Sequence, residues 1–238
     1  MRVELENGYV LHSRPYGDTS VILNCFTEHY GKIALIAKGV RNRKVKQRLY
    51  VQPFTPLLIS WQGKSGLKTL VNVEVKGALR HLNDKRLYSA FYLNELLMRL
   101  LPDNDDHPEI FADYIQALEQ LYGSFELEAV LRQFEFSLIQ GLGYGVDFHY
   151  CIDGSEISTT GRYGYVHEAG FVEAPSSQEG AYSGAELQAI VQGDYGDANV
   201  RRAAKHLART MLRPLLGSRP LSSRKLFKDM TVQGTFHD

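Results

Sequence analysis

The stretch KIALIAKGVRNRKVKQRLYVQPF, residues 32–54, decides the fold expected for the N-terminal part of this chain. Residues 33–37 alternate large apolar side chains with small or polar ones, which predicts a strand buried on at least one face. Gly39 ends that strand. The segment around and after it carries six cations and no acidic residue: Lys38, Arg41, Arg43, Lys44, Lys46 and Arg48.

Six like charges so close together repel one another, so we expect a mobile or extended loop unless an anion gathers it. Tyr50 and Phe54 follow, at positions where a base could stack. A strand that leads into a basic loop beside aromatic residues suits single-stranded nucleic acid, because phosphates need positive charge and unpaired bases need flat surfaces. A solvated, charged hairpin loop is the alternative reading of the same run.

Length and charge divide the chain into segments. Its 238 residues can form one large or two small domains, and the formal net charge is zero. That average hides local charges of +8 over residues 1–80, −15 over 81–200 and +7 over 201–238. No apolar run is long enough to span a membrane and no signal segment begins the chain, so we expect a cytoplasmic protein. The two cysteines do not indicate a disulfide framework.

The first eighty residues are expected to form a small barrel. Short β-branched and aromatic runs alternate there with turn residues, which predicts five strands at 8–14, 19–28, 31–38, 53–62 and 68–76. Five strands with one long basic connection fit an OB-fold, a barrel that binds oligonucleotides, although spacing alone does not exclude an SH3-like barrel. We therefore assign residues 1–80 to a nucleic-acid-binding barrel.

Residues 81–238 are expected to form a mainly α-helical domain, which makes the chain a two-part α+β protein. Apolar residues recur there at helical spacing from Asp84, a candidate N-cap, onward. A second helix is predicted at 108–122, because Pro108 suits a first turn and Gly123 suits a C-terminal cap. A third helix follows and ends at the glycines 141, 143 and 145.

The segment 147–182 is irregular, with one hairpin predicted from 163–167 and 170–173. His149, Cys151 and His167 invite a zinc interpretation. Structural zinc needs four ligands, usually as two close pairs, and one cysteine with loosely spaced histidines does not match. We expect a packed cysteine, surface histidines and no metal. Ser183 and Glu186 form a capping box that begins the next helix.

A basic helix is predicted at 199–216. Its apolar face backs four cations at steps of four residues, Arg201, Lys205, Arg209 and Arg213. Such a row repels itself, so either the acidic middle of the chain or nucleic-acid phosphate should offset it, and we leave both open. Arg224, Lys225 and Lys228 add a basic tail.

No enzyme motif is present. Gly63-Lys64-Ser65 is not a phosphate-binding loop, because position 58 is leucine where that loop needs glycine. His12 and Ser13 are neighbours on a strand and point to opposite faces, so they do not form a hydrolytic pair. We expect a protein without catalytic activity, cofactor or small-molecule substrate.

Several motifs in order resemble the RecO family of bacterial DNA repair proteins: YVLHSRP at 9–15, LIAKGVR at 35–41, QPFTP at 52–56, LNELL at 93–97, and LRQFE at 131–135 with LGYG at 142–145. The resemblance spans nearly the whole chain. It implies an N-terminal OB-fold, a C-terminal helical domain and a recombination mediator that works on the nucleoid. Such a protein binds single- and double-stranded DNA, anneals complementary strands, engages the acidic C-terminal tail of single-strand-binding protein, and acts with RecR to load RecA.

The resemblance also directs attention to particular residues. Many family members carry a four-cysteine zinc module after the LGYG motif, whereas this chain keeps only Cys151 there. A pocket for the acidic tail needs apolar walls and an arginine, and we assign it to Arg132, with Leu131, Leu142 and Tyr144 nearby. The competing reading is an ordinary surface ion pair of Arg132 with Glu128 or Glu135.

In the annealing mechanism we expect, the basic loop holds one strand while the row Arg201, Lys205, Arg209 and Arg213 screens the other. Two functions from other classes stay open at this point. One is an OB-fold that binds single strands without annealing them. The other is a nucleotidyl or hydrolytic enzyme with an unrecognised site.

Overall fold

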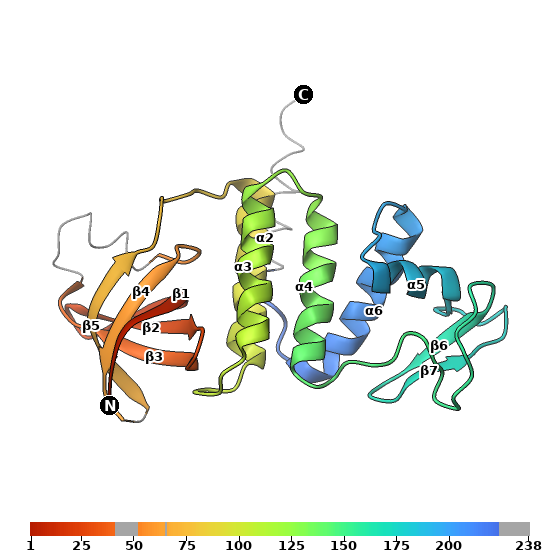
Figure 1. The fold of residues 1–238 in the computed structure, drawn as a ribbon, viewed down its shortest axis with the longest axis horizontal. Helices are drawn as coiled ribbons and strands as arrows, with labels where there is room; N and C mark the ends of the chain where they lie inside the picture. Colours follow the sequence, from red (N-terminus) through yellow and green to blue (C-terminus); the bar gives the residue numbers. More distant parts are fainter. Residues whose placement is uncertain (41–51, 65, 224–238) are drawn as a thin grey trace. The chain divides into compact units, whose positions relative to one another are not determined.

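The computed structural model describes residues 1–40, 52–64 and 66–223 (Figure 1). Most of the predicted basic loop, from Arg41 to Tyr50, and the basic tail from Arg224 onward lie outside the described residues. The chain divides into two compact units. One unit holds Met1–Ser124 and the C-terminal segment from Pro220, and the other holds Phe125–Arg219. Among the described residues, no helix is both long and apolar enough to cross a membrane.

Five strands near the N-terminus close into a barrel, drawn in red to orange in Figure 1. They run in the order β1-β2-β3-β5-β4, and every pair is antiparallel except β3 with β5. This is the OB-fold expected from the sequence. The strands are β1 (Arg2–Tyr16), β2 (Ser20–Thr27), β3 (Gly31–Ala37), β4 (Leu57–Gln62) and β5 (Leu67–Val75).

The barrel interior explains the alternation read in residues 33–37. Ile33, Leu35 and Ala37 are buried in the core cluster, whereas Ala34 and Ile36 face outward and are only half-buried. Their neighbours in the core come from all the other strands, among them Val10, Leu23, Cys25, Leu57, Ile59 and Trp61. Full burial raises the pKa of the Cys25 thiol to about 12, so this cysteine stays protonated and acts as a packing group.

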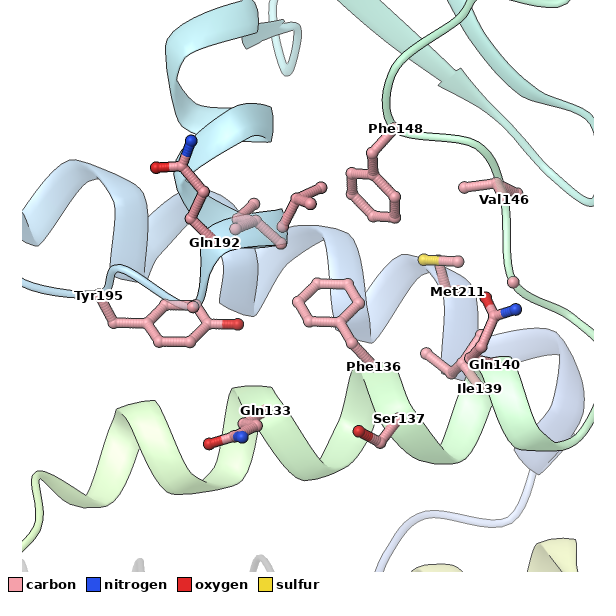
Figure 2. A pocket seen from close by; sticks show the side chains of 14 residues that line it. Gln133, Phe136, Ser137, Ile139, Gln140, Val146, Phe148, Gln192, Tyr195 and Met211 are labelled. Atoms are coloured by element: carbon pink, nitrogen blue, oxygen red, sulfur yellow. The ribbon is translucent and has the colours of Figure 1, made fainter. Parts of the chain in front are cut away.

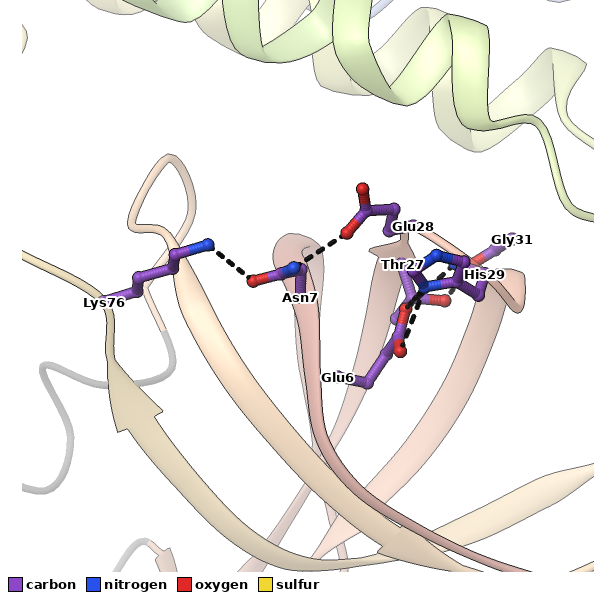
Figure 3. Close-up of polar contacts among 7 residues, drawn as sticks. All are labelled: Glu6, Asn7, Thr27, Glu28, His29, Gly31 and Lys76. Carbon is purple, nitrogen blue, oxygen red and sulfur yellow. Dashed lines mark hydrogen bonds and ion pairs between the residues drawn. The ribbon is translucent and has the colours of Figure 1, made fainter.

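The first strand begins six residues earlier than predicted. Residues 2–8 pair with β4 through a bulge between Val3 and Glu6, and Leu5 adopts a positive φ of 53° there. The polar side chains of this extension form hydrogen bonds with neighbouring segments of the barrel (Figure 3). Asn7 donates to Glu28 at 2.7 Å and accepts from Lys76 at 2.9 Å. These bonds tie β1 to the β2–β3 turn and to the residue that follows β5.

Helices α2 (Asp84–Leu100) and α3 (Pro108–Tyr122) belong to the same compact unit as the barrel. An aromatic layer joins them to the outer side of β1 and β2: the Tyr9 ring lies 6.0 Å from Phe111 and 5.3 Å from Tyr114, between ring centroids. Asn94 of α2 donates to the Leu11 carbonyl at 2.9 Å, and the Tyr114 hydroxyl donates to Asn94 at 2.6 Å. The change from strands to helices falls between β5 and α2, where the sequence predicted it. The compact unit that contains the barrel nevertheless continues through both helices to Ser124.

The predicted helix ends are confirmed in part. The bounds of α3 match the prediction, with Pro108 in the first turn. Asp84 is not the N-cap of α2, because that position is taken by Asn83 and Asp84 has a positive φ of 49°. Gly123 caps α3 in an extended conformation rather than the left-handed one that glycine usually supplies.

The second unit contains α4 (Leu127–Gly141), α5 (Gly184–Gln192) and α6 (Ala198–Leu216) with a small three-stranded sheet. The sheet has the order β7-β6-β8, formed by β6 (Arg162–Val166), β7 (Gly170–Glu173) and β8 (Tyr182–Ser183). The predicted hairpin is confirmed as β6 and β7. The capping box is confirmed as well, since Ser183 accepts from the Glu186 N–H and the Glu186 carboxylate accepts from the Ser183 N–H.

Aromatic packing holds the irregular segment 147–182 together. Phe171 is fully buried, and its ring lies 5.2 Å from Phe148, 5.8 Å from Tyr165 and 6.5 Å from Tyr182. Phe148 in turn reaches Phe136 of α4 at 5.9 Å. Cys151 is buried beside β7, where its backbone forms an isolated parallel β-bridge with Phe171. Buried rings thus supply a core for this segment beside the hydrogen bonds of its small sheet.

We expect replacement of Phe171 to destabilise the second unit. We predict that Phe171→Ala lowers the free energy of unfolding by about 3–5 kcal/mol, because it removes a buried ring and leaves a cavity. Val172→Ala, on the exposed face of the same strand, is the control and should cost less than about 1 kcal/mol. Chemical denaturation in the presence and absence of EDTA provides the measurement. A chelator-induced loss of stability in the wild type would contradict an aromatic core that needs no metal.

Candidate nucleic-acid and partner interfaces

The predicted basic loop follows β3 in the chain, and the described residues on either side of it can be placed. Lys38 is exposed directly after this strand, and Val40 is packed into the barrel core. On the far side of the loop, Phe54 is only 6% exposed and its ring lies 5.0 Å from Phe91 of α2. Tyr122 also donates to the Phe54 carbonyl at 3.0 Å. Phe54 is therefore a packing residue, and the expectation that it could stack on a base is wrong.

The cation row on α6 divides into two parts. Arg201 donates to the carbonyls of Tyr195 and Gly196 at 2.6 and 2.7 Å, and Lys205 pairs with Glu128 of α4 at 2.6 Å. The hydrogen bond from Lys205 outweighs partial burial and lowers the pKa of the Glu128 carboxyl. For these two cations, protein groups supply the compensation that the sequence left open.

The remaining cations of α6 face solvent. Arg209 and Arg213 are exposed, and so is Arg202, which the predicted row did not include. A helix turns through 360° in 3.6 residues, so each step of four drifts by about 40° and the row from 201 to 213 rotates by about 120°. The residues Arg202, His206, Arg209 and Arg213 follow one another at steps of four, three and four. This spacing keeps them on one face of α6. His206 lies 2.6 Å from the Tyr182 hydroxyl.

Arg132 is a buried residue rather than a surface one. It is only 5% exposed, and it donates to Glu135 at 2.8 Å, which is the i+3 pair anticipated as the alternative to a binding role. Its Nε and Nη1 atoms are buried without a hydrogen-bond partner in the part of the chain that the structure describes. Burying such a pair costs desolvation free energy. Removing one member is more destabilising still, because the other charge then stays buried without compensation.

A cavity of about 510 Å³ lies within the second unit (Figure 2). Its walls come from α4, from the chain just after α4, from the end of α5 and from α6, so segments distant in sequence meet there. Aromatic and apolar side chains form much of the lining and three glutamines add amide groups: Phe136, Phe148, Tyr195, Met211, Gln133, Gln140 and Gln192. A lining of this composition suits an aromatic or aliphatic group with a few polar atoms.

The predicted tail-binding residues do not line this cavity. Leu131 and Leu142 are half-buried and Tyr144 is exposed, all outside its walls. Arg132 is not in the lining either, but its charge acts on a lining residue: burial raises the pKa of Tyr195 to about 12, while the charge of Arg132 acts to lower it. Phe136 and Tyr195 were missed from sequence, although Phe136 follows Arg132 by one helical turn and that spacing was a usable signal.

The His, Cys, Asp and Glu side chains of the described residues are dispersed. Within residues 1–40, 52–64 and 66–223, no group of three or more His, Cys, Asp or Glu side chains is placed to hold a metal ion. His12 and Ser13 are exposed on a continuous strand, with no acidic partner for either among the described side chains.

Comparison with known proteins identifies relatives along nearly the whole chain. Residues 1–79 match the family described as "Recombination protein O N terminal" and residues 82–225 match "Recombination protein O C terminal". The chain is 46% identical over 230 residues to a DNA repair protein RecO of Cellvibrio japonicus, covering 95% of this chain and 98% of the relative. It is 42% identical to a RecO of Haemophilus influenzae over 228 residues, covering 95% and 97%. A Yersinia pestis RecO is 40% identical over 230 residues, covering 96% and 95%.

Removal of Arg132 should destabilise the second unit far more than removal of Lys205. We predict a loss of about 3–5 kcal/mol for Arg132→Ala, because Glu135 would stay buried without its cation. Lys205→Ala should cost at most about 1 kcal/mol, since that pair is partly exposed to solvent. Denaturant titration of both variants measures the difference. Equal losses would mean that the Arg132 pair is not buried in solution, and Arg132→Met combined with Glu135→Leu should recover most of the stability.

Proposed function

The chain belongs to the recombination protein O family of DNA repair proteins, and we propose that it is a recombination mediator. In this proposal it binds single- and double-stranded DNA, anneals complementary strands, engages the acidic tail of single-strand-binding protein, and acts with RecR to load RecA. The observation that carries the proposal is the match of both halves of the chain to this family, with 40–46% identity over nearly the full length of the relatives. The setting is the cytoplasm, on the nucleoid.

Annealing needs no covalent chemistry, which is why we propose a protein that is not an enzyme and uses no cofactor. Two polyanionic strands must approach each other against their repulsion, so the protein has to supply positive charge on two surfaces. The barrel end that carries Lys38 and the basic loop is the first surface. The exposed face of α6 with Arg202, Arg209 and Arg213 is the second. Arg201 and Lys205 take part only indirectly, because protein groups already hold them.

The cavity in the second unit is our candidate for the tail of single-strand-binding protein. In the family, that tail ends in an aromatic residue and a carboxylate. Phe136, Phe148 and Met211 provide a wall for an aromatic ring. Arg132 provides positive charge beside Tyr195 and has nitrogens that make no hydrogen bond within the described structure. This assignment replaces Leu131, Leu142 and Tyr144 as the expected contact residues.

The proposal is tested by annealing of complementary oligonucleotides without ATP, using bare strands and strands coated with single-strand-binding protein. We predict that the wild type accelerates annealing of both. Ser137→Trp should fill the cavity and slow annealing of coated strands at least tenfold while bare strands anneal normally. Ser137→Ala is the matched control and should behave as the wild type.

The outcomes separate the alternatives. Binding of single strands without any acceleration of annealing would reduce the chain to a single-strand-binding OB-fold and remove the mediator role. A Ser137→Trp variant that anneals coated strands normally would remove the cavity from the mechanism and leave annealing intact. For the first surface, Arg43→Glu with Lys44→Glu should abolish most binding to bare strands, and unchanged affinity would exclude the basic loop.

A further inference from the structure

The hairpin of β1 and β2 carries a row of side chains outside the surfaces described above. After the bulge at Leu11, His12 pairs with Asn24, Arg14 with Ile22 and Tyr16 with Ser20. Directly opposed residues share a face, and alternate residues along a strand do so as well. Leu23 lies in the barrel core, so its neighbours Ile22 and Asn24 face outward. His12, Arg14 and Tyr16 therefore form one row on the outer face of the barrel.

This row is exposed, and its side chains have no partner among the residues that the structure describes. Tyr16 is 49% exposed, and His12 and Arg14 are exposed as well. None of the three makes a side-chain hydrogen bond, ion pair or ring contact with another described residue. Four other cations of the barrel are held by protein groups: Arg2 by Glu4, Lys32 by Asp103, Lys68 by Asn104 and Lys76 by Asn7. Among the described barrel residues, Arg14 is therefore a cation that no protein group holds, and the exposed Tyr16 ring lies on the same face.

The end of β3 brings a further cation to the same end of the barrel. Val21 pairs with Ala37, so Ser20 and the hairpin turn lie at the end where β3 finishes and exposed Lys38 follows. Asp18 in the turn is the one acidic residue between Arg14 and Ser20. Arg14 and Lys38 thus place positive charge on both sides of the β2 end, with the Tyr16 ring at the hairpin tip.

We propose that this surface is a contact site for single-stranded nucleic acid, in which Tyr16 stacks on an unpaired base while Arg14 and Lys38 contact phosphates. Charge and an exposed ring are the two features that binding of a single strand combines, whereas a duplex keeps its bases stacked and offers none to Tyr16. The inference rests on the proposed function and adds residues to it. It shares Lys38 with the first surface, whereas Arg14 and Tyr16 belong to the β1–β2 hairpin and can be tested apart from the basic loop.

The test measures equilibrium binding of the full-length protein to a fluorescent thirty-residue oligo(dT) across a range of salt concentrations. Tyr16→Ala should weaken binding by about fivefold to about 150-fold, the range expected for loss of one base–aromatic stack. Tyr16→Phe keeps the ring and should bind as the wild type does. Arg14→Ala should reduce the slope of log affinity against log salt by about 0.7, the value for one phosphate contact on a single strand.

Two control variants remove the same residue types elsewhere. Tyr150→Ala deletes a tyrosine of similar exposure in the second unit, and Arg2→Ala deletes an exposed arginine at the other end of β1. Neither should change the affinity or the salt slope. The replaced side chains are all exposed, so thermal melting should confirm that each variant folds.

The result that overturns the inference is wild-type affinity and slope in both Tyr16→Ala and Arg14→Ala while the wild type binds oligo(dT). That outcome leaves the proposed function intact. If Tyr16→Phe weakens binding as much as Tyr16→Ala, the hydroxyl rather than the ring makes the contact, and the stacking assignment is wrong. If the wild type itself does not bind oligo(dT), the proposed function and this site fail together.

Discussion

The register of β1 is the constraint on which the first unit depends. Val10 points into the barrel and lies opposite Cys25. The bulge at Leu11 then shifts the pairing with β2, so His12 lies opposite Asn24 and the residues beyond it keep this shifted register. The bulge exposes the Leu11 carbonyl to α2, where Asn94 donates to it, and Tyr9 next to it reaches α3. A buried carbonyl without a donor is costly, so barrel closure and helix docking are linked through this hydrogen bond.

Much of this fold could be predicted from local patterns. The alternation of residues 33–37, the helix Pro108–Tyr122 and the Ser183 capping box are all set by neighbours in sequence, and the structure confirms them. The early start of β1 could not be predicted, because its polar residues gain their role only by pairing with β4 and the β2–β3 turn. Of the four cations predicted as one row on α6, two are exposed and two are held by protein groups, since a strict step of four departs from the helical period.

The candidate site was less predictable than the fold. Arg132 was identified from sequence, but its burial against Glu135 depends on tertiary packing. The cavity has walls from four separate segments, so no local pattern announces it. Aromatic residues in segment 147–182 looked like irregular loop residues, yet Phe171 proves to be the centre of a small core. In each case the missing information was which distant surface a side chain faces.

The most direct test of this account is native-state hydrogen exchange on the wild type and on Asn94→Ala. If Asn94 links barrel closure to helix docking, amides of β1, β2, α2 and α3 should lose protection together, by a common 1–3 kcal/mol or so. Loss of protection in α2 alone, with the amides of β1 and β2 unchanged, would contradict it. The barrel would then be stable independently of the helices, and the register of β1 would not depend on Asn94.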